Sequence, residues 1–217
     1  MDLNLMNLNT KAREQNTFDV IVVGSGISGG WAAKELCEQG LKVLILERGK
    51  NVEHPNYPTT IKDPWELEHH GKLTQEDRRK SHIQTRHYSF QGDNKHFYVN
   101  DLENPYTEIK RYDWVRGDVV GGRSLLWGRH CYRWSDLDFE ANLKDGHGTD
   151  WPMRYKDLTT WYDYVEKFIG VSGQQENLEH FPNQSLQPPM EMNCVEKHFK
   201  AEVEKKFPDR RITIGRV

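Results

Sequence analysis

A glycine-rich turn between two strongly apolar runs is the feature that most constrains this fold. Residues 18–23 and 41–47 are rich in β-branched and other apolar side chains, and residues 24–29 between them have the pattern GxGxxG. Apolar runs of this kind predict parallel strands buried on both faces. Residues 30–39 carry apolar positions on one helical face, and Gly40 stands where a helix typically ends in a left-handed residue. The order predicts a strand–helix–strand unit of an α/β, Rossmann-like fold.

The glycine pattern also predicts a dinucleotide site. Gly24 allows the tight turn, Gly26 lets a pyrophosphate approach the backbone, and Gly29 permits close packing of helix on strand. The helix N-terminus attracts the phosphates, and Glu47, at the end of the second strand, can accept hydrogen bonds from a ribose. The other candidates in this segment are Ser25, Ile27, Ser28 and Arg48. The alternative is a turn whose glycines serve packing alone.

The acidic residue at position 47 narrows the choice of cofactor. A carboxylate there suits NAD or FAD and repels the extra phosphate of NADP. Residues 50–110 are polar and show no further buried parallel strand, whereas an NAD domain continues at once with more such units. FAD is therefore the favoured cofactor, and an NAD-dependent dehydrogenase domain is the lesser alternative. Within this insertion we expect short helices near Pro64 and after Thr74, the latter capped by Asp77, and a strand at 96–99.

A second glycine cluster follows at residues 119–128. Its glycines would let the backbone approach a flat ring or a phosphate, and its tryptophan would supply a planar wall. The candidate cofactor contacts here are Gly121, Gly122, Ser124, Leu125, Trp127 and Gly128. Taken alone, the cluster is more typical of a glycine-rich turn beside a core tryptophan.

Helices dominate the expected C-terminal part. Between Leu158 and Ile169 the apolar residues trace one helical stripe that Gly170 ends. Asn193 followed by Glu196 predicts a second helix start, and residues 211–215 are typical of a strand.

Composition excludes several classes of protein. The net charge of −3 argues against a nucleic-acid binder, and no apolar run is long enough to span a membrane. The polar start lacks the pattern of a secretory signal. Three scattered cysteines form no disulfide framework, so we expect a cytoplasmic protein, with periplasmic export beside a partner subunit left open. The ten histidines show no metal-ligand spacing, and no metal site is expected.

Several segments together resemble the GMC (glucose–methanol–choline) oxidoreductases. Residues 20–30 (VIVVGSGISGG) with 46–49 (LERG) resemble the start of that family, and residues 120–128 (VGGRSLLWG) its second flavin-contact segment. Residues 150–153 (DWPM) and 165–171 (VEKFIGV) are similar to the stretch that follows. The nearest branch is that of the gluconate dehydrogenase large subunit and pyranose oxidase.

The resemblance implies FAD, an alcohol or sugar substrate, hydride transfer from a CH–OH group to flavin N5, and an electron-acceptor subunit as a candidate partner. Some members link FAD through a histidine just before the tryptophan of the second segment. Leu126 stands there, so no such link is expected. The family's histidine base lies in a C-terminal half without counterpart here, so no catalytic residue is assigned and the chain alone is expected to be inactive.

We therefore expect an FAD-binding Rossmann-like unit with a partial cap, in a truncated chain. The expected parts are a flexible leader (1–17), the FAD-binding unit (18–50), a polar insertion (51–112), the second flavin-contact segment (113–135) and an incomplete cap and substrate region (136–217). The competing function is a non-catalytic nucleotide-binding module or a subunit of a split enzyme.

Overall fold

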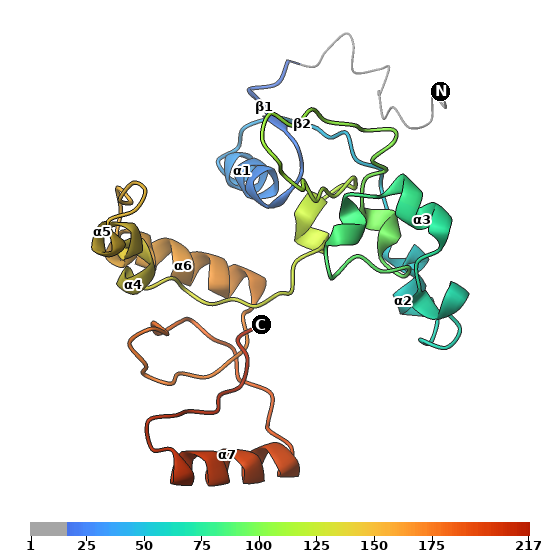
Figure 1. Cartoon of the computed structure of the whole chain (residues 1–217). Helices are drawn as coiled ribbons and strands as arrows, with labels where there is room; N and C mark the ends of the chain where they lie inside the picture. Colours follow the sequence, from blue (N-terminus) through green and yellow to red (C-terminus); the bar gives the residue numbers. More distant parts are fainter. Residues whose placement is uncertain (1–16) are drawn as a thin grey trace. The chain divides into compact units, whose positions relative to one another are not determined.

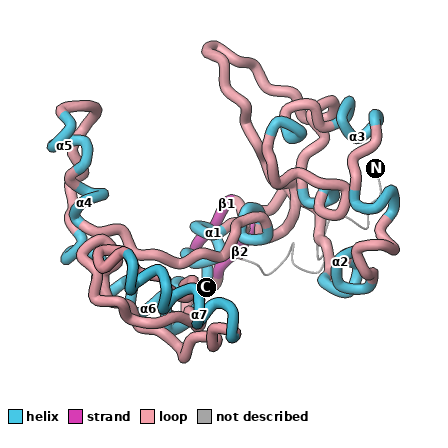
Figure 2. Tube along the Cα trace, turned by 60° about the horizontal axis from the view of Figure 1, so that its bottom comes forward, coloured by secondary structure: helices cyan, strands magenta, loops and turns pink. Residues whose placement is uncertain are grey.

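The computed structural model describes residues 17–217. The chain divides into two compact units, Met1–Trp127 and Gly128–Val217 (Figure 1). Strands occur only near the start of the described chain, and long loops join the helices (Figure 2). The expected leader, apart from Thr17, lies outside the described residues.

The predicted strand–helix–strand unit is confirmed. Strand β1 (Val20–Val23) leads into helix α1 (Ile27–Glu38), and strand β2 (Val43–Leu46) returns parallel to β1. Val20 pairs with Val43 and Val23 with Leu46 in the register. Gly40 follows α1 with a φ of +84°, the left-handed conformation expected of a terminating glycine. The fold of this part is thus the Rossmann-like α/β unit that the glycine pattern predicts.

The expectation that both strands are buried on both faces is wrong. Helix α1 contacts both strands, and β1 alternates between half-buried and exposed residues. On the exposed face, Ile21 is 59% and Val23 is 82% accessible, and Leu46 is also exposed. The physical reason is that the sheet has only two strands within residues 17–217, which is too few to bury both of its faces.

The insertion after β2 consists of single turns and short helices. Its elements are η3 (His54–Asn56), α2 (Pro58–Ile61), η4 (Glu68–Gly71), α3 (Gln75–Lys80), η5 (Gln84–Arg86) and η6 (Lys95–Phe97). Helix α3 begins at the predicted capping box, because the Thr74 hydroxyl accepts from the Asp77 amide while the Asp77 carboxylate accepts from the Thr74 amide.

Two expectations for the insertion are wrong. The segment after Pro64 is an isolated turn in which Glu66 N–H donates to the Asp63 carbonyl. The extended backbone of Leu67 (φ −62°, ψ 139°) ends this turn before it can continue as a helix. The expected strand at 96–99 is a 3-10 turn followed by one isolated bridge, Tyr98 to Gly117, so no ladder of hydrogen bonds forms.

A small core joins the insertion to the second glycine segment. Phe90, Phe97, Tyr98 and Val119 are buried together. Beside them, Lys50 forms a parallel bridge with Val119, in which the Val120 amide donates to the Lys50 carbonyl at 2.9 Å. The insertion therefore leaves and re-enters the unit at one place.

The second unit is helical. It contains α4 (Asp136–Phe139), α5 (Ala141–Asp145), α6 (Tyr155–Ile169) and α7 (Cys194–Lys206). Gly170 ends α6 with a φ of +75°, and the Asn193 side chain caps α7 by accepting from two backbone amides, as the sequence predicts. The prediction of a strand at 211–215 is wrong. The nearest reciprocal backbone pairing is at Val217 with Ser172, so that run lacks a partner strand.

The buried face of α6 is polar at its centre. Glu166 is buried and accepts from the buried Arg133 guanidinium at 2.8 and 2.6 Å. Gln184 donates to the same carboxylate at 2.7 Å. Much of the predicted apolar stripe is exposed instead: Trp161 is 64% accessible, and Phe168 and Ile169 are also exposed. The other members of the stripe, Leu158, Tyr162 and Val165, are half-buried, so the stripe is only partly covered.

Candidate functional site

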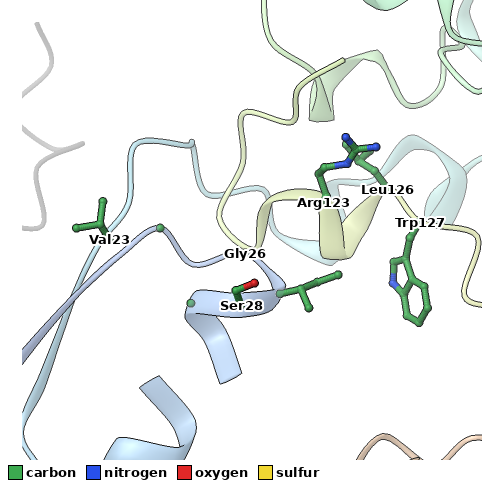
Figure 3. Close-up of a pocket in the computed structure, with 9 residues that line it drawn as sticks. Val23, Gly26, Ser28, Arg123, Leu126 and Trp127 are labelled. Atoms are coloured by element: carbon green, nitrogen blue, oxygen red, sulfur yellow. The ribbon is translucent and has the colours of Figure 1, made fainter. Parts of the chain in front are cut away.

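A cavity of about 550 Å³ lies over the glycine-rich turn of the first unit (Figure 3). One side is formed by the end of β1 and the first turn of α1, and the other by the second glycine segment, which contacts α1. The lining residues are Val23, Gly24, Gly26, Ile27, Ser28, Gly29, Arg123, Leu126 and Trp127. Two motifs about a hundred residues apart in sequence therefore meet at one cavity.

Each position of the first motif requires glycine for a different steric reason. Gly24 has a φ of +88°, which L side chains rarely adopt. A Cβ at Gly29 would lie 1.9 Å from the Gly24 carbonyl oxygen, so no side chain fits between helix and strand there. A Cβ at Gly26 would meet no atom within 4 Å. The backbone at Gly26 is thus open to the cavity, as a pyrophosphate contact requires.

The N-terminus of α1 borders the same cavity. Gly26 is its N-cap residue, and no side chain of the described residues caps it. The first intrahelical bond runs from the Gly30 amide to the Gly26 carbonyl at 2.8 Å. Amides of a first helical turn have no intrahelical acceptor, and the helix dipole adds positive partial charge. The arrangement can therefore bind an anion.

Glu47 is held by a dense set of hydrogen bonds. Its Oε2 accepts from the Ser25 amide at 2.7 Å and from the Ser25 hydroxyl at 2.6 Å. Its Oε1 accepts from the amides of Arg48 and Gly49, both at 2.7 Å. Burial by itself would raise the pKa of Glu47, but the hydrogen bonds from Ser25, Gly49 and Arg48 lower it to about 2. The carboxylate is therefore ionised at neutral pH and acts only as an acceptor.

The second glycine segment turns sharply against the first. Gly121 and Gly122 have φ angles of +87° and +52° and lead into η7 (Gly122–Leu125). The Gly121 amide donates to the Ser25 hydroxyl at 2.8 Å. A Cβ at Gly122 would lie 3.4 Å from Gly26 Cα. Close approach of the two backbones thus accounts for the paired glycines.

Trp127 borders the cavity rather than a core. Its side chain is partly exposed and, in Figure 3, projects from the end of the second glycine segment. A large planar side chain beside an anion-binding turn suits contact with a flat ring.

The structure brings most of the predicted site residues together, though in different ways. Ser25, Glu47 and Gly121 are joined by hydrogen bonds, and Arg48 lies on the surface with its Nη2 3.5 Å from Asp118. Leu125 packs against the small core, and the Ser124 hydroxyl donates to the Gly121 carbonyl. Gly128 begins the second unit and does not line the cavity.

Three residues that line the cavity were not predicted from the sequence. Val23 ends β1, and Arg123 and Leu126 belong to the second glycine segment. Arg123 lies between the predicted contacts Gly122 and Ser124, and this position is the signal that could have identified it. Its Nη1 donates to the Val115 carbonyl at 3.3 Å.

These residues fit a bound dinucleotide. The face over Gly26 is open, the α1 N-terminus suits phosphates, and Glu47 supplies an ionised carboxylate at the end of β2. Within residues 17–217, no cluster of three His, Cys, Asp or Glu side chains is arranged to hold a metal ion. Nor does that part of the chain contain a helix with the length and apolar character needed to cross a membrane.

Comparison with known proteins agrees with this site. Residues 22–52 match the family described as NAD(P)-binding Rossmann-like domain. Over 157 residues the chain is 28% identical to 2-methyl-1,2-propanediol dehydrogenase from Mycolicibacterium austroafricanum, covering 71% of this chain and 25% of the relative.

Of two further relatives, one is named as a flavoprotein and the other as a large subunit. Gluconate 2-dehydrogenase flavoprotein from Pantoea cypripedii is 30% identical over 179 residues, covering 76% of this chain and 27% of the relative. Fructose dehydrogenase large subunit from Gluconobacter japonicus is 26% identical over 187 residues, covering 85% and 32%. The chain thus spans about a quarter to a third of the length of these relatives. The predicted resemblance to GMC oxidoreductases is confirmed by these similarities.

Proposed function

We propose that this chain forms the FAD-binding N-terminal part of a GMC-type oxidoreductase that oxidises a CH–OH group of an alcohol or sugar. The observation that carries the proposal is the cavity in which the GxGxxG turn and the second glycine segment with Trp127 meet. Relatives named for oxidation of a diol, gluconate and fructose support the substrate class.

Each part of the site has a role in this proposal. The α1 N-terminus and the open backbone at Gly26 hold the pyrophosphate, and the Glu47 carboxylate accepts a hydrogen bond from a ribose hydroxyl. The segment from Gly121 to Trp127 lies beside the flavin. FAD, when bound, supplies the acceptor for a hydride from the alcohol carbon.

We assign no catalytic base to this chain. None of its histidines carries the sequence context of the family's base, so we expect the isolated chain not to turn over alcohols. An electron-acceptor subunit is the proposed partner, because one relative is named as the large subunit of its enzyme. We place the protein in the cytoplasm, where its three free cysteines would stay reduced.

NAD binding is the second candidate, because the matching family is described as NAD(P)-binding. Titration of the purified full chain with FAD, followed by quenching of flavin fluorescence, and a parallel titration with NAD distinguish the two. We expect binding of FAD to be at least tenfold tighter than binding of NAD. Tight NAD binding without FAD binding would overturn the proposal.

A matched pair of variants connects that measurement to the site. Glu47→Gln removes the carboxylate charge and should raise the Kd for FAD, whereas Glu38→Gln removes an exposed carboxylate of α1 that pairs with Lys34 and should leave the Kd unchanged. Equal effects of the two variants would mean that Glu47 does not contact the cofactor.

A further inference from the structure

The Ser25 hydroxyl is the point where the two glycine segments join. It donates to Glu47 Oε2 at 2.6 Å and accepts from the Gly121 amide at 2.8 Å. The first bond reaches the end of β2, and the second reaches a segment 96 residues further along the chain. One side chain thus links three separate parts of the first unit.

The hydrogen-bonding capacity of this hydroxyl decides what it can do. A serine hydroxyl has one donor and two acceptor positions. Its donor is given to Glu47, and one acceptor position is taken by Gly121. What remains is an acceptor, which cannot bind a phosphate oxygen. The geometry therefore argues against the Ser25 side chain as a direct phosphate ligand.

Glu47 is held in place by the surrounding backbone and by Ser25. Four protein donors from Ser25, Arg48 and Gly49 fix the orientation of its ionised carboxylate. Because the Glu47 carboxylate is ionised, each of these hydrogen bonds is stronger than one to a neutral group. The carboxylate is therefore a fixed acceptor for the Ser25 hydroxyl and orients its oxygen toward Gly121.

We propose that Ser25 is a positioning residue: its hydroxyl bridges Glu47 and the Gly121 amide and so sets the second glycine segment against the GxGxxG turn. The inference deepens the proposed function and rests on it for the cofactor. Because Gly122 approaches Gly26 beside this bridge, loss of the bridge would loosen the wall of the cavity that carries Trp127.

The test uses the full chain with Ser25→Ala, Ser25→Thr and a control, Thr85→Ala. The alanine variant removes the bridging hydroxyl, and the threonine variant retains one. The control removes another hydroxyl of the first unit, which donates to the His82 carbonyl and lies outside the site. Two readouts are measured: hydrogen exchange of the Gly121 amide by NMR, and the Kd for FAD.

In Ser25→Ala we expect the Gly121 amide to exchange roughly tenfold faster and the Kd for FAD to rise roughly three- to tenfold, as loss of a hydrogen bond implies. In Ser25→Thr, which retains a hydroxyl, the exchange rate and the Kd should stay close to the wild-type values. Thr85→Ala should change neither. Unchanged exchange at Gly121 in Ser25→Ala would overturn the bridge. Faster exchange with an unchanged Kd would overturn its importance for the cofactor.

The outcomes separate this inference from the proposed function. If the wild-type chain binds no FAD, the proposed function and the cofactor role of Ser25 both fail. The exchange rate of Gly121 still shows whether the bridge positions the segment, because that measurement needs no cofactor.

Discussion

Single glycines carry the sharpest steric constraints in this molecule. At Gly29 an added Cβ would lie 1.9 Å from a backbone oxygen, whereas at Gly26 it would meet nothing within 4 Å. The sequence pattern predicts both roles, because the motif ties one glycine to packing and the other to the ligand. Substitution of each by alanine therefore separates folding from binding.

Gly29→Ala should destabilise the first unit by about 3 kcal/mol, because helix and strand must move apart. Gly26→Ala should cost less than about 1 kcal/mol in stability but weaken FAD binding at least tenfold, since its methyl group would face the pyrophosphate. Urea denaturation and flavin titration measure the two effects. Wild-type FAD affinity in a folded Gly26→Ala chain would contradict the assignment of that face to the pyrophosphate.

The pKa of Glu47 gives a second prediction at this scale. Hydrogen bonds hold it at about 2 in the folded chain, below the ordinary value of 4.5. A depressed folded pKa stabilises the fold fully above about pH 4.5, and that contribution is lost as the pH falls toward 2. In Ser25→Ala the pKa should rise, because one of the lowering hydrogen bonds is removed.

The measurement is a titration of the Glu47 carboxyl carbon by NMR, which reports this group alone. That selectivity matters because the pKa of Asp77, paired with Lys95, is also lowered to about 2 and affects stability in the same range of pH. A wild-type midpoint near 4.5 would show that the hydrogen bonds to Glu47 do not persist in solution.

At the scale of elements, the sequence predicts well the helix starts and ends that depend on neighbouring residues. The Thr74 and Asn193 caps and the Gly170 terminus depend on residues within four positions of one another, so they can be recognised without the tertiary fold. The strands expected at 96–99 and 211–215 failed because a strand needs a distant partner that the sequence does not identify.

The interior of the second unit was missed for a related reason. The pattern of α6 predicts an apolar stripe, yet the one buried residue of this helix is Glu166. That burial depends on Arg133 and Gln184, which come from segments before and after the helix. A charged residue within a helical stripe gives no sign in the sequence of which distant partner neutralises it.

Glu166→Gln should destabilise the second unit by about 3 kcal/mol, because it leaves the Arg133 charge buried without its main partner. Asp163→Asn is the matched control. Asp163 also pairs with Arg133, but its side chain is 41% exposed, so the cost should stay below about 1 kcal/mol. Urea denaturation followed by circular dichroism compares the two variants. Equal losses would show that burial does not set the strength of these pairs.

At the scale of the whole molecule, apolar surface is the dominant feature. One face of the two-stranded sheet exposes Ile21, Val23 and Leu46, and α6 exposes Trp161 and Phe168. A two-stranded sheet with one uncovered face is marginal in water, and contiguous apolar patches on soluble chains usually mark contact surfaces. The chain spans about a quarter to a third of the length of its relatives. Its strands have the apolar pattern of buried strands, but the structure leaves several of their side chains exposed.

The sheet face should therefore bind a hydrophobic dye. We expect the double variant Ile21→Thr/Leu46→Thr to bind substantially less anilinonaphthalene sulfonate than the wild-type chain, because both side chains belong to the exposed patch. Ile109→Thr is the control, since Ile109 is 98% exposed but lies in the loop between η6 and η7 and not in either strand. Equal reductions in dye fluorescence from both variants would show that the sheet face is not the binding surface.

The bridge between Lys50 and Val119 has a consequence for how this architecture can vary. It closes the insertion at its base, where a Cβ at Gly49 would lie 2.5 Å from the Val119 backbone. Lengthening a closed loop costs only about 0.6 kcal/mol per doubling. The insertion can therefore change in length while the two glycine segments keep their positions relative to each other, so the cavity between them does not depend on how long the insertion is.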